Sequence, residues 1–129
     1  MQVERLDHLV LTVADIAVSC AFYRRVLGLR EVTFGAGRKA LAFGQQKINL
    51  HQHGAEFEPK ARRPTPGSAD LCFIVSTPLD EVIAHLSACA VPIEQGPVRR
   101  SGATGPLLSV YIRDPDDNLI ELANLQEEA

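Results

Sequence analysis

The order of the predicted secondary-structure elements repeats once along this chain, and this repeat restricts the possible folds more than any other feature. In the first half, alternation of apolar and polar residues predicts a strand over residues 6–13, and an amphipathic helix follows over 16–27. Three further strands are predicted at 30–34, 38–43 and 47–52. The first half therefore has the pattern β-α-β-β-β.

The second half follows the same order with one gap. A strand is predicted over residues 69–75, and Pro78 begins a helix at a position where proline is tolerated. Two strands are predicted near the end of the chain, over 109–113 and 119–124. Residues 94–106 are rich in glycine and proline, which predicts a mobile loop. The repeat requires one more strand before residue 109, but the sequence does not clearly signal it.

A segment without periodicity separates the two halves. Residues 54–67, GAEFEPKARRPTPG, hold three prolines and are predicted to form a linker across the surface. The chain has 129 residues, which is enough for one compact domain and too few for two ordinary ones. We therefore expect a single domain over residues 1–129. Its two modules would cover about residues 4–53 and 69–125, with the linker at 54–68.

The stretch Arg113–Asn124, RDPDDNLIELAN, combines a turn with a strand. Pro115 fixes φ, and the short aspartate and asparagine side chains around it can bond their own backbone, so a tight turn is predicted. The strand after the turn alternates, which places Glu121 opposite Ile120 and Leu122. A buried carboxylate there would need a cation, a hydrogen-bond donor or a metal as partner. Alternatively, that face of the strand meets water and Glu121 is simply solvated.

Four polar residues occupy matching places in the two halves. His8 and Asp70 lie in the first strand of each half, and Asn49 and Glu121 lie in the last strand. Each is on the face opposite the apolar residues that would face the helix. One polar residue on an apolar strand is weak support for a site. Four of them at matching positions in a repeat indicate a shared site.

The composition narrows the classes of partner. The formal net charge is −3, so the sequence shows no basic footprint for nucleic acid or for a membrane surface. Hydrophobic residues make up 46% of the chain, which predicts a packed core. The sequence shows no signal peptide and no stretch of membrane-spanning length. Cys20, Cys72 and Cys89 each lie in an apolar run, which favours reduced thiols over disulfides. We therefore expect a cytoplasmic protein.

Three motifs, in this order, resemble the vicinal oxygen chelate superfamily. They are DHLVLTV at 7–13, FYRRVLGL at 22–29 and RDPDDNLIEL at 113–122. The superfamily includes glyoxalase I, bleomycin-resistance proteins, fosfomycin-resistance proteins and extradiol dioxygenases. Within it, the run RKALAFGQQKINLHQHGAEFEPKA at 38–61 resembles the glyoxalase domain-containing protein 5 group.

The resemblance implies an α+β fold of two βαβββ modules. Their strands would form a curled, mostly antiparallel, eight-stranded open sheet around a U-shaped cleft. An open sheet leaves unpaired edges, and family members usually dimerise to complete or cover them. We therefore expect a homodimer that binds a small molecule. Whether one chain supplies the whole cleft or two chains share it is left open.

The resemblance also implies four metal-ligand positions, one on the first and one on the last strand of each module. In this sequence they are held by His8, Asn49, Asp70 and Glu121. Two of them depart from the usual set, because Asp70 stands where metal-bearing relatives often have histidine and Asn49 stands where bacterial glyoxalase I has glutamate. One imidazole, two carboxylates and an amide oxygen favour Mg²⁺, Mn²⁺ or Ca²⁺ as the bound ion. Nickel, zinc and iron are the alternatives.

Two functions of different class follow from the resemblance. The first is a divalent-metal-dependent lyase or isomerase acting on a small substrate with vicinal oxygens, with Glu121 leaving the metal to act as base. The second is a binding protein in which the polar residues bond one another and a small molecule is sequestered without turnover. An extradiol dioxygenase is the least favoured enzyme, because its iron site uses two histidines and one carboxylate.

Three further residues are candidates for contact with a substrate. His51 lies on the same strand face as Asn49, so it could be a fifth ligand or an acid-base group, or a solvent-exposed histidine at the end of the strand. Arg99 and Arg100 lie in the predicted loop and could bind a carboxylate or phosphate group. Solvated loop arginines are the alternative.

Overall fold

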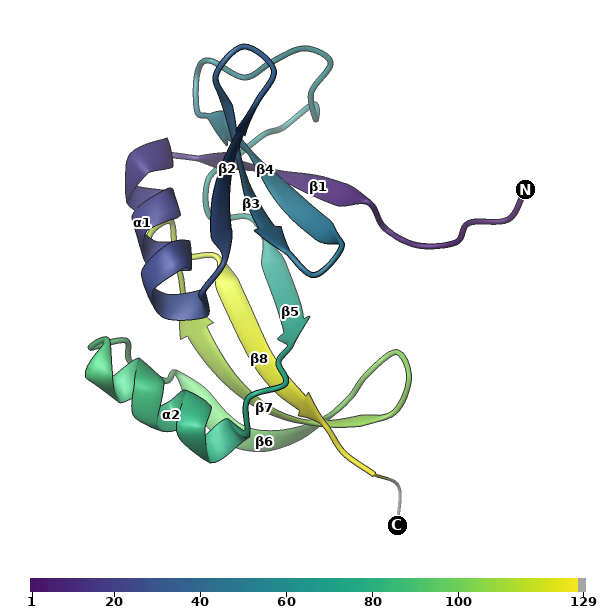
Figure 1. The fold of residues 1–129 in the computed structure, drawn as a ribbon, viewed down its shortest axis with the longest axis vertical. Coiled ribbons are helices and arrows are strands. Elements are labelled where there is room, and N and C mark those ends of the chain that lie inside the picture. The colour runs from purple at the N-terminus through teal and green to yellow at the C-terminus, as the bar shows by residue number, and fades with distance from the viewer. Residues whose placement is uncertain (128–129) are drawn as a thin grey trace. The chain divides into compact units, whose positions relative to one another are not determined.

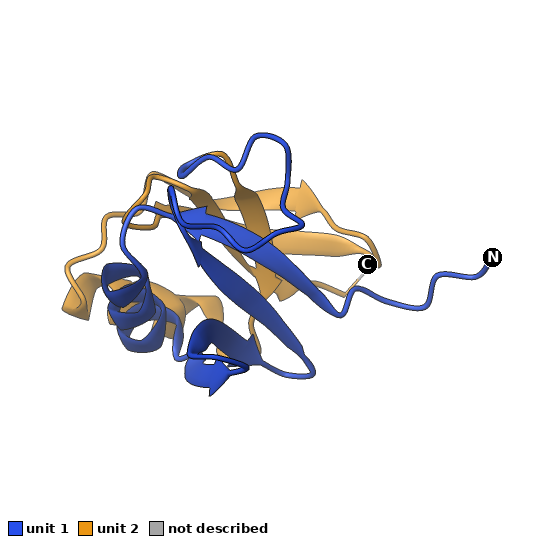
Figure 2. Cartoon of the chain, turned by 90° about the horizontal axis from the view of Figure 1, so that it is seen from above, with its two compact units in different colours: residues 1–67 blue, residues 68–129 orange. Residues whose placement is uncertain are grey.

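The computed structural model describes residues 1–127, and the chain divides into two compact units. Unit 1 is Met1–Gly67 and unit 2 is Ser68–Ala129 (Figure 2). In its described part, each unit contains one helix and one four-stranded sheet. That the two units together make a single domain stays a prediction.

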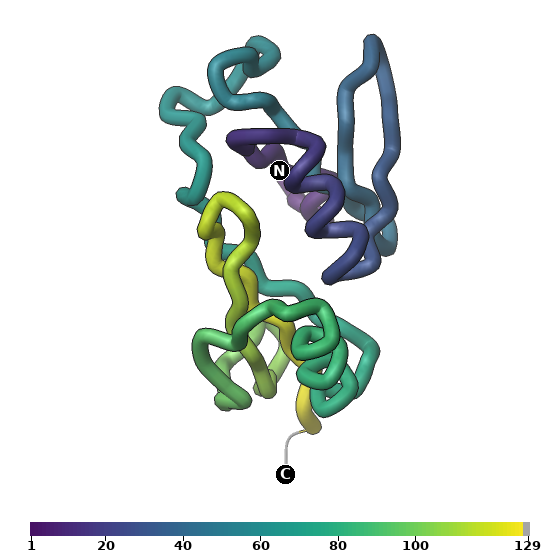
Figure 3. Tube along the Cα trace, turned by 90° about the vertical axis from the view of Figure 1, so that its left-hand side faces the viewer, coloured from purple at the N-terminus to yellow at the C-terminus, as the bar shows by residue number. Residues whose placement is uncertain are grey.

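Unit 1 has the predicted β-α-β-β-β order (Figure 1). Its sheet has the strand order β1-β4-β3-β2, in which β1 and β4 are parallel and the other pairs are antiparallel. The β2–β3 hairpin is visible as the long, narrow loop of blue chain in Figure 3. Its elements are β1 (His8–Val13), α1 (Ile16–Leu27), β2 (Arg30–Phe34), β3 (Arg38–Phe43) and β4 (Gln46–Gln52).

Helix α1 covers one face of the unit 1 sheet. The Asp15 side chain caps its start by accepting a hydrogen bond of 3.1 Å from Val18 N, and Gly28 ends it with φ at 68°. The helix packs against β2, β3 and β4. Its buried face includes Tyr23, and the buried side chains of the sheet include Ile48 on β4. The alternate residues of each strand therefore lie on the face away from the helix.

Unit 2 repeats the same topology. Its sheet has the order β5-β8-β7-β6, with β5 and β8 parallel and the remaining pairs antiparallel. Leu79, Val82 and Leu86 form the buried side of α2. The elements are β5 (Asp70–Ile74), α2 (Leu79–Ala88), β6 (Gln95–Ser101), β7 (Pro106–Arg113) and β8 (Leu119–Leu125).

The expectation of a mobile loop over residues 94–106 is wrong. Most of this stretch is strand β6, which pairs with β7 and carries a register shift between Gln95 and Val98. The glycine and proline content misled the prediction because β6 is an edge strand, where proline and an irregular register are tolerated. Residues 54–67 contain no helix or strand, as predicted.

The turn at residues 114–118 has the predicted tight geometry. The buried carboxylate of Asp114 accepts hydrogen bonds of 2.8 Å from Asp116 N, 2.9 Å from Asn118 N and 2.9 Å from Asn118 Nδ2. Asn118 Oδ1 in turn accepts a hydrogen bond of 2.8 Å from Ala69 N. The turn thereby links the start of β8 to the start of β5.

The two sheets have the same register at the candidate positions. His8 is paired with Lys47, two residues before Asn49, and Asp70 is paired with Leu119, two residues before Glu121. The fold is therefore α+β, and residues 1–127 contain eight strands in two mixed four-stranded sheets and two helices. This confirms the predicted fold class. Neither helix in residues 1–127 is long and apolar enough to cross a membrane.

Candidate functional site

The face of unit 1 away from α1 carries several polar residues. On β1 and β4 the register pairs Val10 with Asn49 and Thr12 with His51. His8 and Lys47 form the next pair on the same face, because side chains alternate along a strand. The structure therefore places the sequence-predicted residues His8, Asn49 and His51 on one face of unit 1.

His8 has one ring nitrogen engaged. Its Nδ1 lies 2.8 Å from Asp7 Oδ2, and the side chain is 43% exposed. The hydrogen bond to His8 lowers the pKa of the Asp7 carboxyl. A carboxylate on one ring nitrogen is the arrangement that orients metal-binding histidines, because it leaves the other nitrogen for the ion.

Asn49 carries a buried oxygen whose hydrogen-bonding capacity is unused. Its residue is 5% exposed, and Oδ1 has no hydrogen-bond partner among the atoms of residues 1–127. Burying an amide oxygen without a donor or cation is unfavourable. This atom therefore has an unused capacity to accept a hydrogen bond or to bind a cation.

His51 is buried, at 4% exposed, so the alternative of a solvent-exposed histidine is wrong. Its Nε2 lies 3.4 Å from Arg38 Nη2, and its ring packs edge-on to Phe57 with centroids 5.7 Å apart. Burial, followed by the charge of Arg38, lowers the pKa of His51 below its ordinary value, although Glu56 acts in the opposite direction. His51 is therefore uncharged at neutral pH.

Unit 2 has a corresponding polar face. Cys72 is paired with Glu121, and Tyr111 flanks Glu121 on the other side. Ser109 Oγ donates a hydrogen bond of 2.6 Å to Glu121 Oε2. Asp70 lies on this face two residues before Cys72. The structure therefore places Asp70 and Glu121 on one face of unit 2.

The Cys72 thiol responds to the charges of this face. Burial, followed by the charge and the hydrogen-bond acceptor of Glu121, raises the pKa of Cys72 to about 11. The Asp70 carboxylate adds to this rise. The thiol is therefore protonated at neutral pH and can donate to Glu121.

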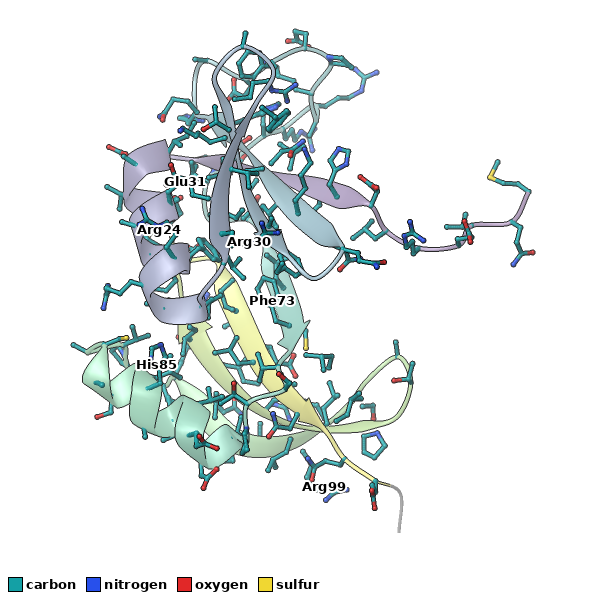
Figure 4. All side chains as sticks on the ribbon, in the orientation of Figure 1. Arg24, Arg30, Glu31, Phe73, His85 and Arg99 are labelled. Carbon is teal, nitrogen blue, oxygen red and sulfur yellow. The ribbon has the colours of Figure 1, made fainter. Side chains whose placement is uncertain are left out.

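The two candidate arginines lie on opposite faces of β6. Arg100 shares the face of Val98, which is paired with Ser109, so it lies on the Glu121 side of the sheet. Its Nε donates a hydrogen bond of 2.9 Å to Tyr111 Oη. Arg99 lies on the other face and is exposed (Figure 4). Only Arg100 is therefore placed to join the polar face of unit 2.

The candidate metal donors are divided between the two units. Each unit contributes two candidate donors, which are His8 and Asn49 in unit 1 and Asp70 and Glu121 in unit 2. Within residues 1–127, no group of three or more histidine, cysteine or acidic side chains is arranged to hold a metal. The unused oxygen of Asn49 and the free nitrogen of His8 are the observations that fit such an ion.

Some residues of these faces were missed at the sequence level. Ser109 was assigned to a strand, but nothing in the sequence showed that it faces Glu121 until the β7–β8 register was known. Arg38 was counted as the start of a strand, and Phe57 belongs to the proline-containing linker. Alternation along 38–43 and 47–52 could have placed Arg38 on the Asn49 face, whereas the position of Phe57 had no sequence signal.

A surface hollow in unit 1 contains none of the candidate residues. It lies where α1 ends and β2 begins, and Figure 4 labels Arg24, Arg30 and Glu31 beside it. Arg24 Nη1 lies 3.6 Å from Glu31 Oε1. The positive charges of the arginines in the last helical turn interact favourably with the negative end of the helix dipole. These contacts account for Arg24 and Glu31 without a ligand.

Paired β-α-β-β-β modules with a polar sheet face opposite each helix define a glyoxalase-like protein. The profile of the Glyoxalase/Bleomycin resistance protein/Dioxygenase superfamily matches residues 5–122. The chain belongs to this superfamily.

Two curated relatives are similar over nearly the whole chain. "Virulence protein STM3117" of Salmonella typhimurium is 60% identical over 123 residues, which are 95% of this chain and 85% of the relative. "Glyoxalase domain-containing protein RDO1" of Mycosarcoma maydis is 54% identical over 127 residues, covering 98% of this chain and 72% of the relative. The closer resemblance to the glyoxalase domain-containing protein 5 group stays a prediction.

Solved structures agree with this membership. The crystal structure of the Salmonella virulence protein has a TM-score of 0.96 and 59% identity, covering 98% of this chain and 100% of that one. A lactoylglutathione lyase from Agrobacterium tumefaciens has a TM-score of 0.73 and 26% identity, with 96% of each chain covered. The fosfomycin resistance protein FosX of Listeria monocytogenes, solved with Mn(II), is 21% identical with a TM-score of 0.66, covering 97% of this chain and 93% of that one. That last likeness shows the fold alone.

Proposed function

We propose that this protein is a divalent-metal-dependent enzyme of the lyase or isomerase type that acts on a small substrate with vicinal oxygens. The observation that carries this proposal is the buried Oδ1 of Asn49, which has no partner among residues 1–127 and lies on the same sheet face as His8. An uncompensated oxygen of this kind is stabilised by a cation. The proposed ligand set is His8, Asn49, Asp70 and Glu121, with Mn²⁺, Mg²⁺, Ni²⁺, Zn²⁺ or iron as the ion.

Stabilisation of negative charge on adjacent substrate oxygens is the chemistry that a bound divalent ion would supply. The protein's own part in catalysis falls to Glu121, which we assign as the base. Its Oε2 is held by Ser109 at 2.6 Å, so the carboxylate has a fixed orientation and Oε1 can take a proton from the substrate. His51 and Arg100 are proposed to contact the substrate from the polar faces of units 1 and 2.

Two relatives support the enzyme class. A lactoylglutathione lyase with 26% identity shares the fold, and FosX, which was solved with manganese, shares it at lower identity. These activities belong to the two relatives. They are the reason to test this chain first for a metal-dependent reaction on a small oxygenated molecule.

The test is turnover of α-ketoaldehyde–thiol adducts, fosfomycin and catechols with added Mn²⁺, Ni²⁺ or Fe²⁺. We expect turnover of at least one class that chelator abolishes, and a Glu121→Gln variant should lose ~100-fold or more in kcat. Glu81→Gln, on the exposed side of α2, is the matched control and should keep full activity. Turnover that survives both the chelator and Glu121→Gln would contradict the proposal.

The second candidate is a protein that sequesters a small molecule without turnover. Two observations favour this alternative. Asn49 is a poor metal ligand, and residues 1–127 contain no group of three strong ligands. It predicts tight binding of an aromatic or cationic small molecule by metal-free protein, measured by calorimetry. Near-stoichiometric metal in protein purified without chelator would favour the enzyme instead.

The assembly is proposed to be a cytoplasmic homodimer. Val10 on edge strand β1 is 44% exposed and Ile74 on edge strand β5 is 53% exposed, and exposed apolar side chains on open edges favour association. Sedimentation should show a dimer at tens of micromolar. A monomer throughout that range would contradict this part of the proposal.

A further inference from the structure

Arg38 is held between two aromatic rings that come from different parts of unit 1. Its Cζ lies 5.0 Å from the centroid of Phe34 on β2 and 4.5 Å from the centroid of Phe57, in the segment after β4. Each ring attracts the guanidinium through its π face, and together they fix its plane. Such an arginine is positioned before any ligand arrives.

The hydrogen-bonding capacity of this guanidinium is not filled. Nη2 contacts His51 Nε2 at 3.4 Å, which is a long contact, and Nε is buried without a partner among the described residues. No acidic side chain within residues 1–127 forms an ion pair with Arg38. The nearby Glu56 carboxylate is already occupied, because it accepts from Gly54 N at 2.9 Å and lies 3.6 Å from Lys60 Nζ.

A second unpaired cation lies beside the first. Lys47 Nζ lies 3.7 Å from the centroid of the Phe34 ring, so Lys47 and Arg38 share one aromatic neighbour. Lys47 likewise forms no ion pair with the acidic residues in the described part of the chain. The Lys47 charge acts on the exposed Asp7 carboxylate, whose pKa it helps to lower, but it also repels the Arg38 charge. A bound anion would reduce that repulsion.

These residues lie on the sheet face that carries Asn49. Lys47, Asn49 and His51 alternate along β4, and Ala40, two residues after Arg38, is paired with Asn49. The face also presents apolar surface, since Val10 is 44% exposed and Phe57 is 47% exposed. A cationic patch beside apolar surface suits a small organic anion better than a bare inorganic ion.

We propose that Arg38 and Lys47, with buried His51 beside them, bind the anionic group of the substrate, a carboxylate or a phosphonate. Arg38 would donate from the edge of the guanidinium, and Lys47 would add a point charge. The inference rests on the proposed function, which it deepens by assigning a negative charge to the substrate. It involves residues of unit 1 only.

The experiment is calorimetric titration of chelator-treated, metal-free protein with phenylphosphonate, benzoate and inorganic phosphate. We expect saturable binding of at least one of the two organic anions, weakened by added salt. Arg38→Gln should lower the affinity at least ~10-fold. Arg38→Lys should lower it less, because lysine keeps the positive charge, although it lacks the planar, two-pronged donor group of arginine. Arg62→Gln removes the same charge from an exposed position in unit 1 and should change nothing.

The comparison of the two organic probes distinguishes a tetrahedral anion from a planar carboxylate. Absence of saturable binding to either, or equal affinity in Arg38→Gln and the original protein, would overturn the inference. If Arg38→Gln does not fold, Lys47→Gln takes its place. Removing this one point charge should lower the affinity for the organic anion ~3-fold or more. Unchanged affinity in a folded Lys47→Gln would also overturn it.

Failure of this inference and failure of the proposed function give different results. Anion binding is measured without metal, so a protein that binds the organic anions but never binds metal or turns over substrate contradicts only the proposed function. Metal-dependent turnover that is indifferent to Arg38→Gln contradicts only the anion site.

Discussion

Ser109 donates a hydrogen bond of 2.6 Å from its Oγ to Glu121 Oε2, between the neighbouring strands β7 and β8. Ser109 is fully buried, so the hydroxyl does not exchange this acceptor for water. A short hydrogen bond to a carboxylate is stronger than one between neutral groups. Ser109 therefore fixes the orientation of the residue that we assign as the base.

Replacing Ser109 by alanine should remove the hydrogen bond that orients Glu121 while leaving the Glu121 carboxylate in place. We expect divalent-metal affinity to fall ~10-fold or more, the size of effect that residues behind the direct ligands produce in metal sites. Titration calorimetry with Mn²⁺ measures this, with the exposed Ser101→Ala as control. Equal affinity of Ser109→Ala and the original protein would show that the hydrogen bond is only structural.

The Cys72 thiol should react slowly despite its exposure. Burial and Glu121 raise its pKa to about 11, and the thiolate is the reactive form. At about pH 8 we expect alkylation of Cys72 to be ~10-fold or more slower than that of an unperturbed thiol. Glu121→Gln should accelerate it, because the neutral amide no longer opposes the thiolate. Peptide mass spectrometry separates Cys72 from Cys20 and Cys89. A rate indifferent to Glu121→Gln would argue against this electrostatic coupling.

His51 should make the protein less stable in acid. Its pKa is lowered in the folded state, so the unfolded chain binds a proton more readily. The stabilising effect of the neutral ring is therefore present above the ordinary pKa of about 6.5 and is lost as the pH falls toward the folded pKa.

Chemical denaturation at about pH 7.5 and about pH 5.5 measures the effect. The original protein should lose more unfolding free energy between these values than His51→Gln does. His53→Gln, at an exposed position, is the control and should behave like the original protein. The same loss in all three proteins would exclude His51 as the cause.

The Asp114 turn should contribute strongly to stability. Its buried carboxylate accepts three hydrogen bonds, and Asp114→Ala would leave those donors unsatisfied. We expect a loss of about 2 kcal/mol or more in the free energy of unfolding. Asp114→Asn keeps the shape and should lose less. A loss below about 0.5 kcal/mol for Asp114→Ala would mean that water replaces the carboxylate.

Much of the fold was predictable because it depends on local periodicity. Alternation along β1, β4 and β8 placed His8, Asn49 and Glu121 on the faces away from the helices, and the turn at 114–118 followed from its short polar side chains. Strand β6 was missed because its ladder to β7, rather than its own sequence, makes it a strand.

The site was less predictable because it depends on contacts between elements. Phe57 reaches Arg38 and His51 from a segment without periodicity, and the buried state of His51 follows from that packing. Arg99 and Arg100 were treated alike, but the register of an unrecognised strand places them on opposite faces. Local patterns carry no information on such pairings.

The central claim, a divalent ion bound by His8, Asn49, Asp70 and Glu121, is tested most directly through Asp70→Asn. Without an ion, Asp70 and Glu121 are two carboxylates on one sheet face that repel each other. Arg113 is near enough for the Asp70 charge to help raise its pKa, but its closest carboxylate is Glu94, at 3.0 Å. The measurement is the thermal denaturation midpoint of the original protein and of Asp70→Asn, each with and without chelator. Our account predicts that chelator lowers the midpoint of the original protein, and that Asp70→Asn binds metal ~10-fold or more weakly and gains less from it. A variant that is more stable than the original protein, with no effect of chelator on either, would contradict the metal site.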